Sequence, residues 1–287
     1  ATTQLQKGGF QVAWVEKARG SGGRLSSKRI KSQINKGIVS FDLGCQSFGS
    51  KTKLFSKQLE SWISLGIASK WDCAGGNNSE YVASPRSSSI TRYLADQSEV
   101  YFSTRVLGIG KENGLWHVYT DEHESSTLFA QTNHIVFAIP PQQAADLLPP
   151  AHPFITPLNQ SILLPQWVLM LNVKGGLGLN HGDYKFTDSI ISRLSLEQEK
   201  PGRASNESNQ VWMIQASTKW TMNYLDIDKT NEENVTKLTR YLSCFAEFLL
   251  DKANEEVHKH ISDVAIDIDD LKESEDPYLK QLANLKL

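Results

Sequence analysis

The first residues with types and spacing that could do chemistry are an acid and a glycine-rich basic loop behind it. Residues 12–15 (Val-Ala-Trp-Val) form a short apolar run that ends at Glu16, and Lys17, Gly23 and Arg24 lie in the loop that follows. An acid at the end of the second strand of a Rossmann unit accepts hydrogen bonds from an adenosine ribose. Glycines beside an arginine let the backbone approach a pyrophosphate and place a charge on it. We therefore predict that these four residues bind a dinucleotide.

One part of that site is missing from the chain. The Gly-x-Gly-x-x-Gly turn is expected about 20 residues before the ribose acid, and counting back from Glu16 passes the first residue. Residues 1–10 are typical of the rest of the helix after that turn, anchored by Leu5 and ended by Gly8 and Gly9. The chain also has no initiator Met. We expect an internal fragment without its first strand and phosphate loop.

Five blocks of the chain resemble a known superfamily, in order, between residue 1 and about residue 257. Residues 16–24 resemble the flavin-containing amine oxidases, and residues 41–48 (Phe-Asp-Leu-Gly-Cys-Gln-Ser-Phe) resemble the Asp-x-Gly-Ala-Gln-Tyr-Phe segment of their renalase-like branch. Residues 136–144 resemble the strand and proline turn that return to the cofactor domain. Residues 200–203 (Lys-Pro-Gly-Arg) and 215–220 (Gln-Ala-Ser-Thr-Lys-Trp) match two later blocks of that branch.

The resemblance implies FAD as cofactor and assigns further residues to it. It places Gly44, Gln46 and Ser47 beside the isoalloxazine, and Val106 at the adenine through its backbone. Arg193 is a candidate for a phosphate-bearing substrate, with a charged loop as the alternative. Trp220 is a candidate pocket wall, with a core position as the alternative.

The resemblance also implies a reaction. The flavin would take a hydride from a small amine or a dihydronicotinamide-type substrate and pass the electrons to oxygen or another acceptor, so we name no catalytic side chain. Some positions depart from the family pattern: Ser47 stands for Tyr, Cys45 for Ala and Gln215 for His, and the C-terminal flavin block does not occur before Leu287. Two alternatives stay open. One is a truncated or decayed homologue that binds no FAD, and the other is a desaturase- or protoporphyrinogen-oxidase-like flavoenzyme.

Hydrophobic periodicity and turn residues predict the elements that position these residues. We expect helices over residues 52–65, after residues 87–89, and on a stripe from Val235 to about Leu249. We expect strands over 100–109, 115–120, 134–139, 167–173 and 211–216, a tight turn at Asn113 and Gly114, and loops over 72–79 and 196–210.

These elements predict an α/β chain, α+β overall, with two domains. A discontinuous, incomplete Rossmann-like FAD domain would use residues 1–60 and 85–145, with 263–287. A sheet-containing substrate domain would use residues 61–84 and 146–262.

Bulk properties limit the partners. A net charge of −2 provides no basic footprint for nucleic acid or for a membrane surface, and no apolar run approaches the roughly 20 residues that cross a bilayer. Three distant cysteines (Cys45, Cys73 and Cys244) make a disulfide scaffold unexpected. No histidine pair has metal-ligand spacing, so we predict no metal site. A cytoplasmic protein fits best, although a lost N-terminus could have carried a signal peptide, and the oligomeric state is left open.

Overall fold

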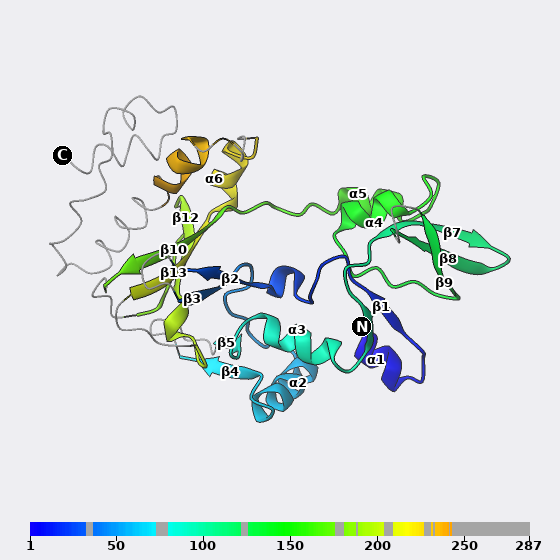
Figure 1. The fold of residues 1–287 in the computed structure, drawn as a ribbon, viewed down its shortest axis with the longest axis horizontal. Coiled ribbons are helices and arrows are strands. Elements are labelled where there is room, and N and C mark those ends of the chain that lie inside the picture. The colour runs from blue at the N-terminus through cyan, green and yellow to red at the C-terminus, as the bar shows by residue number, and fades with distance from the viewer. Residues whose placement is uncertain are drawn as a thin grey trace. The chain divides into compact units, whose positions relative to one another are not determined.

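The computed structural model describes residues 1–32, 37–72, 80–121, 126–175, 181–187, 189–203, 209–226, 231, 233–240 and 242 (Figure 1). The chain forms two compact units, each built from two separate stretches. Unit 1 is Ala1–Gly23 with Ser88–Leu164, and unit 2 is Arg24–Ser87 with Pro165–Leu287. Both contain helices and sheets, so the predicted mixed α/β class is confirmed. The unit bounds differ from those of the predicted FAD and substrate domains, whose functional assignment stays a prediction.

Unit 1 contains a parallel strand pair and an antiparallel sheet. Strand β1 (Ala13–Val15) pairs in parallel with β6 (Glu99–Tyr101). The antiparallel sheet has the order β7-β8-β9, formed by Val106–Glu112, Leu115–Thr120 and Thr127–Thr132. The helices are α1 (Thr2–Lys7), α3 (Ser88–Ala95), α4 (Pro141–Leu147) and α5 (Ile155–Gln160). The predicted helix after residues 87–89 and the strand over 115–120 are therefore confirmed.

The predicted turn between β7 and β8 is also confirmed. Asn113 and Gly114 have φ angles of 51° and 82°, the pair of positive values that a two-residue hairpin turn requires.

Two strand predictions in unit 1 are wrong. The strand expected over residues 100–109 is interrupted by Ser103, which has a φ of 55°. The chain leaves β1 at this point, and Ser103 N–H donates to the carbonyl of Ala18 over 3.0 Å. The strand expected over residues 134–139 is irregular backbone. Its Val136 and Ile139 are exposed, and the strand that pairs with β8 is β9, which lies earlier in the chain. An apolar run without a partner strand forms no ladder.

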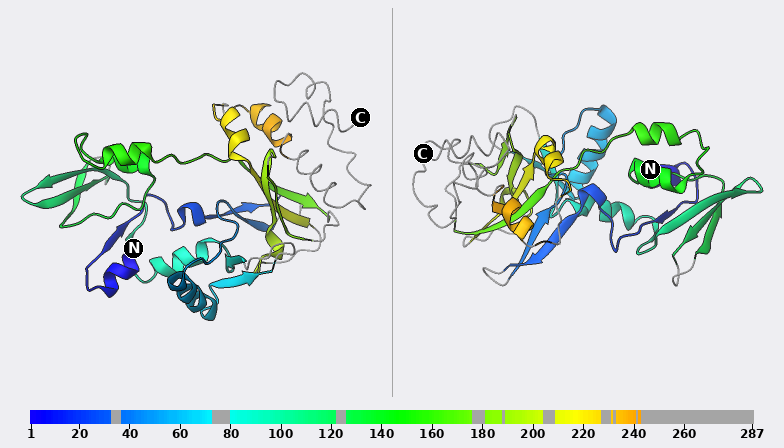
Figure 2. Two further views of the ribbon diagram at one scale, coloured as in Figure 1. Left: turned by 180° about the vertical axis from the view of Figure 1, so that it is seen from behind. Right: turned by 90° about the horizontal axis from the view of Figure 1, so that it is seen from above.

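Unit 2 is built around a four-stranded antiparallel sheet, whose strands are green to yellow-green in Figure 2. Its strand order is β10-β13-β12-β11. These strands are Val168–Lys174, Asn209–Ala216, Ile191–Leu196 and Asp183–Lys185, respectively. Two antiparallel pairs accompany it: β2 (Ser27–Lys31) with β3 (Ile38–Asp42), and β4 (Ala68–Trp71) with β5 (Glu80–Ala83). The predicted strands over 167–173 and 211–216 are confirmed as β10 and β13.

The helical predictions in unit 2 hold where the structure describes them. Helix α2 (Lys53–Ser64) begins after Thr52, whose hydroxyl accepts from Phe55 N–H over 3.2 Å as an N-cap. Helix α6 (Thr218–Asn223) begins after Ser217, which caps Trp220 in the same way. Residues 233–240 are helical, and the rest of the predicted stripe lies outside the described residues. The same is true of most of the loop expected over 72–79.

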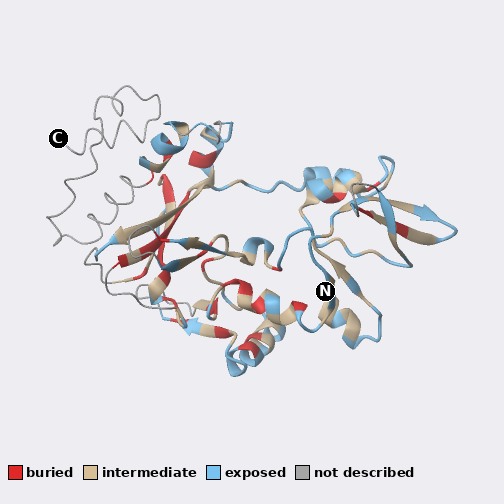
Figure 3. Cartoon of the chain, viewed as in Figure 1, coloured by how far each residue is buried: buried red, intermediate tan, exposed pale blue. Residues whose placement is uncertain are grey.

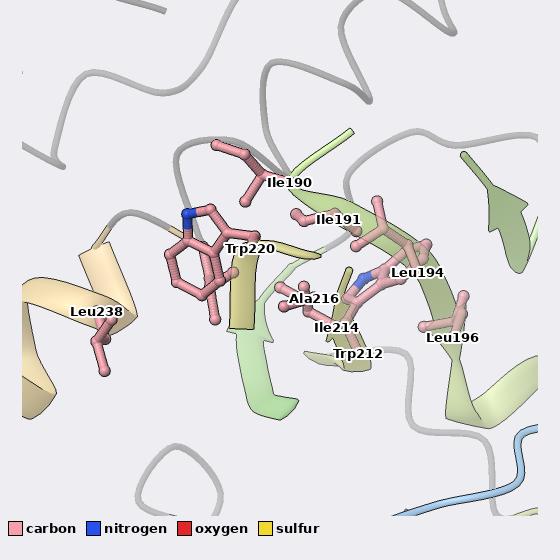
Figure 4. Packing of buried hydrophobic residues seen from close by; sticks show 10 residues of the cluster. Ile190, Ile191, Leu194, Leu196, Trp212, Ile214, Ala216, Trp220 and Leu238 are labelled. Carbon is pink, nitrogen blue, oxygen red and sulfur yellow. The ribbon is translucent and has the colours of Figure 1, made fainter. Parts of the chain in front are cut away.

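The central strands of the unit 2 sheet, β12 and β13, are largely buried on both faces (Figure 3). Successive side chains of β13 point to opposite faces. Trp212 and Ile214 join the main core, to which β12 and Trp220 also contribute (Figure 4). Val211 and Met213 pack against Phe41 of β3 on the other side. The end of β3 therefore packs against the second face of the sheet. The segment with the predicted flavin residues Gly44, Gln46 and Ser47 begins at this end of β3.

Candidate functional site

The predicted cofactor and substrate residues fall into two groups. Glu16, Lys17, Gly23 and Val106 belong to unit 1, whereas Arg24, Gly44, Gln46, Ser47, Arg193 and Trp220 belong to unit 2. The structure brings residues together within each group, and the two groups are described in turn.

In unit 1, Glu16 follows β1 at the carboxyl end of the parallel pair, which is where nucleotides bind in open α/β sheets. Its Oε1 accepts from Ala18 N–H over 2.9 Å, and its carbonyl accepts from Thr104 N–H over 3.1 Å. Thr104 lies two residues before Val106, the first residue of β7. The structure therefore brings the acid and the start of the hairpin together. Lys17 is exposed and donates to Gln143 over 3.3 Å, and Gly23 has a φ of 51°.

In unit 2, we call the segment from Asp42 to Phe48 the 42–48 segment. Side chains hold it in place by donating hydrogen bonds to its backbone carbonyl groups. Gln46 Nε2 donates to the carbonyl of Asp42 over 2.5 Å. The carbonyl of Gly44 accepts from Gln215 Nε2 over 3.0 Å. The carbonyl of Cys45 accepts from the hydroxyl of Ser87 over 3.2 Å. Three side chains from different parts of unit 2 thus fix this backbone.

Gly44 is required by a close backbone approach. A Cβ at this position would contact the carbonyl of Arg24, with the carbonyl carbon only 3.1 Å away. The same carbonyl accepts from Cys45 N–H over 3.0 Å. The glycine therefore lets the 42–48 segment lie directly on the turn that carries Arg24, whose side chain is exposed.

Four charged side chains form a buried ion cluster beneath the 42–48 segment. Lys200 Nζ lies 2.8 Å from Glu197 Oε1 and 3.4 Å from Asp42 Oδ2. Arg203 Nη2 lies 2.5 Å from the same Asp42 oxygen, and its Nε lies 3.8 Å from Glu197 Oε2. All four side chains are at most 5% exposed. Two acids and two bases balance one another formally, as buried charges require.

The two acids of the cluster are pushed in opposite directions. Burial alone would raise the pKa of Asp42, but the charges of Lys200 and Arg203 outweigh it. Together with hydrogen bonds from Ser87 N–H and Ser27, they lower that pKa. Burial raises the pKa of Glu197, and the attraction of Lys200 does not compensate for it. Asp42 is therefore the acid whose charged form its neighbours stabilise, and Glu197 is the acid whose charged form burial disfavours.

Arg193 is the centre of a second charged group. Its Nε and Nη2 lie 2.6 and 2.9 Å from the two carboxylate oxygens of Asp183, and Nη2 also donates to Ser47 over 2.6 Å. Glu80 contacts both Arg193 and Ser47. The guanidinium also lies over the ring of Trp71, 5.9 Å from its centre. The guanidinium is thus held by three polar side chains and by the ring of Trp71, all in unit 2, and its predicted role toward a substrate phosphate stays a prediction.

The sequence analysis did not predict the acids that pair with the buried cations. These acids are Asp42 and Glu197 for Lys200 and Arg203, and Asp183 for Arg193. The loop expected over residues 196–210 is wrong at its start, because β12 continues to Leu196 and a 3₁₀ turn, Glu197–Glu199, follows. Glu197 and Lys200 are buried rather than solvated. A glutamate three residues before a lysine was the available signal, but it does not show that Asp42 lies opposite.

Trp220 lies in the core, where it is 2% exposed, and its ring centre is 4.5 Å from that of Tyr224. Trp212 is buried in the same cluster. The alternative of a core position for Trp220 is confirmed, and its pocket role stays a prediction. Within the described ranges, no group of three His, Cys, Asp or Glu side chains could hold a metal ion. The described helices include none that is long and apolar enough to span a bilayer.

No protein-family model matches the chain. Three solved structures are similar to it. A protein assigned as a protoporphyrinogen oxidase from Exiguobacterium sp. 255-15 shares 15% identity, with a TM-score of 0.45, over 64% of this chain and 39% of that one. A double mutant of putrescine oxidase shares 15% identity, with a TM-score of 0.42, over 65% and 40%.

Wild-type putrescine oxidase bound to putrescine shares 12% identity, with a TM-score of 0.48, over 91% of this chain and 81% of that one. The chain thus spans about two fifths of the first two structures.

Proposed function

We propose that this chain is part of an FAD-dependent oxidoreductase of the renalase-like kind. One observation carries the proposal: blocks of the resemblance that are far apart in the sequence meet in unit 2. Gln46 contacts Lys200, Asp42 contacts Arg203, and Gly44 contacts Gln215, across 154, 161 and 171 positions. Chance similarities in unrelated stretches would have no reason to contact one another.

The residues present fit a flavin at their backbone. Among the described residues, the N–H groups of Gly44, Gln46 and Ser47 have no hydrogen-bond partner, so they remain available to an acceptor such as the polar edge of an isoalloxazine. The side-chain amide of Gln46 points inward to Asp42 and Lys200, so we assign its contact with flavin to the backbone. In unit 1, Glu16 and Val106 keep their predicted roles at the ribose and the adenine, and Lys17 and Gly23 keep theirs at the phosphates. Arg24 of unit 2 keeps its predicted role at the phosphates as well.

When bound, FAD would accept a hydride from a small amine or a dihydronicotinamide-type substrate and pass electrons to oxygen or another acceptor. The protein contributes binding and orientation in this proposal, and Arg193 and Trp220 are its substrate-side candidates. We propose no metal, nucleic acid or membrane partner.

The test is a visible absorbance spectrum of the purified chain, before and after incubation with FAD and desalting. Retained flavin bands are the expected result, and anaerobic mixing with each substrate class would then bleach them. A chain with a Gly-x-Gly-x-x-Gly strand and turn added at its N-terminus is the matched control. If neither form retains FAD, the proposal is overturned in favour of a decayed homologue.

A further inference from the structure

The side chain of Gln46 has only one orientation that satisfies its surroundings. The residue is 2% exposed, and its Oε1 accepts from Lys200 Nζ over 2.8 Å. Its Nε2 faces the carbonyls of Asp42 and Gly44. An ammonium group can only donate hydrogen bonds. Lys200 therefore determines which end of the amide faces it, because a flipped amide would place two donors together and leave two carbonyls unpaired.

Lys200 is itself fixed from several sides. Its side chain has no exposed surface, and its ammonium contacts Glu197 and Asp42 as well as Gln46. It also lies 5.8 Å from the ring centre of Trp71. A side chain held in this way cannot exchange between positions as a surface lysine does.

We propose that Lys200 is a positioning residue, which acts through Gln46 to hold the 42–48 segment in the conformation that presents its free N–H groups. This inference rests on the proposed function, because it takes those groups to face the flavin. It assigns Lys200 a task beyond that of a counter-ion for Asp42 and Glu197. The two roles differ in what happens when the Gln46 contact is lost and the charges stay in place.

The first experiment uses Gln46→Met in the purified chain. Methionine has a similar volume, and the four charges of the ion cluster stay in place. Cys45 reports on the segment, because its thiol is partly buried and donates to the carbonyl of Ser47 over 3.1 Å. Alkylation by iodoacetamide, followed by peptide mass analysis, separates Cys45 from Cys73 and Cys244. We expect about tenfold faster alkylation of Cys45, because the segment opens more often.

The matched control is Lys70→Met, which removes a lysine from an exposed ion pair with Asp72 in the same unit. It is expected to alkylate at the wild-type rate. If Gln46→Met also keeps the wild-type rate, the inference is overturned.

The second experiment tests Lys200 directly. The double variant E197Q/K200M removes one charge of each sign, so that Asp42 and Arg203 still balance. We expect it to speed Cys45 alkylation about as much as Gln46→Met does, after correction for its own urea unfolding midpoint. If the double variant is less stable to urea but its Cys45 is alkylated at the wild-type rate, Lys200 is only a counter-ion and the inference is overturned. If the double variant does not fold, Gln46→Met decides.

FAD titration of the same variants separates this inference from the proposed function. Gln46→Met is expected to weaken FAD binding about tenfold and to shift the visible band of bound flavin, which a change in stability alone would not do. If wild type and Lys70→Met bind no FAD, with or without the N-terminal extension, while Gln46→Met still exposes Cys45, the proposed function fails and the positioning of the segment stands. If all three bind FAD alike and protect Cys45 alike, the positioning role fails and the proposed function stands.

Discussion

Arg203 donates from Nη2 to Oδ2 of Asp42 over 2.5 Å, although the two residues lie 161 positions apart in the chain. Both side chains are at most 5% exposed. Losing one member of such a pair leaves the other charge buried without compensation. We expect Asp42→Asn to lower the free energy of unfolding by about 3–5 kcal/mol, measured by urea denaturation.

Glu197→Gln provides a contrast within the same cluster. Burial disfavours the charged form of Glu197 and raises its pKa, so its charge contributes less to stability than that of Asp42, and glutamine has nearly the same shape as glutamate. We expect a loss of about 1 kcal/mol, clearly smaller than that of Asp42→Asn. Equal losses in the two variants would contradict the assignment of Asp42 as the acid whose charged form its neighbours stabilise.

The opposite pKa shifts determine how stability depends on pH. The pKa of Asp42 is lowered in the folded state, as is that of Glu80, where hydrogen bonds from Lys185 and Ser47 outweigh burial. Below their ordinary values, about 3.9 for Asp and 4.3 for Glu, the unfolded chain binds more protons than the folded one. Stability from these two acids is therefore complete above that range and is lost as the pH falls through their folded pKa values.

The effect of Glu197 on stability has the opposite dependence on pH. Its contribution to the free energy of unfolding decreases as the pH rises from the ordinary pKa of the carboxyl group toward its raised pKa. Urea unfolding of wild type, Asp42→Asn and Glu197→Gln between neutral and acid pH checks the statements about Asp42 and Glu197. As the pH falls, Asp42→Asn should lose less of its free energy of unfolding than wild type does. An unchanged acid slope would mean that Asp42 is not charged in the folded protein.

Gly44→Ala tests the close approach of the 42–48 segment to the Arg24 turn. The added Cβ would meet backbone atoms, which cannot rotate away as a side chain can. We expect a loss of about 1–3 kcal/mol, measured as a lower urea midpoint. Gly49→Ala is the matched control, because a Cβ there has nothing within 4 Å. A similar loss at both glycines would contradict the steric account.

Glu16→Gln tests the ribose assignment in unit 1. Glutamine keeps an oxygen that can accept from Ala18 N–H, as Oε1 of Glu16 does, but it lacks the negative charge that strengthens hydrogen bonds from ribose hydroxyls. We expect FAD to bind about tenfold more weakly, the effect of losing roughly 1.5 kcal/mol, in a fluorescence titration. Asp146→Asn, at an exposed position of the same unit, should bind like wild type. Equal affinities for all three proteins would argue against the assignment.

Local patterns predicted the elements that depend on neighbouring residues. Asn113 and Gly114 give a hairpin turn in almost any context, and the apolar spacing of α2 together with Thr52 identifies a capped helix. Residues 134–139 had the composition of a buried strand, but a strand also needs a partner at the correct edge. Composition does not report that partner, so the prediction failed there.

The buried ion cluster could not be predicted for a related reason. In the sequence alone, Lys200 and Arg203 have the pattern of surface cations. Asp42 comes beside them only because β3 packs against the second face of the sheet. The resemblance identified the 42–48 segment and residues 200–203 as separate blocks. Only the structure shows that they are two sides of one contact.

The two stretches of unit 2 have a consequence for synthesis. The ribosome makes Asp42 long before Lys200 and Arg203, with most of unit 1 in between. Domains generally fold as units while the chain emerges, but the two cations that pair with Asp42 belong to the second stretch. We expect nascent chains arrested before Lys200 to keep the Asp42 carboxylate in water. Unit 2 would then become protease-resistant only once the strand that ends at Ala216 has left the exit tunnel.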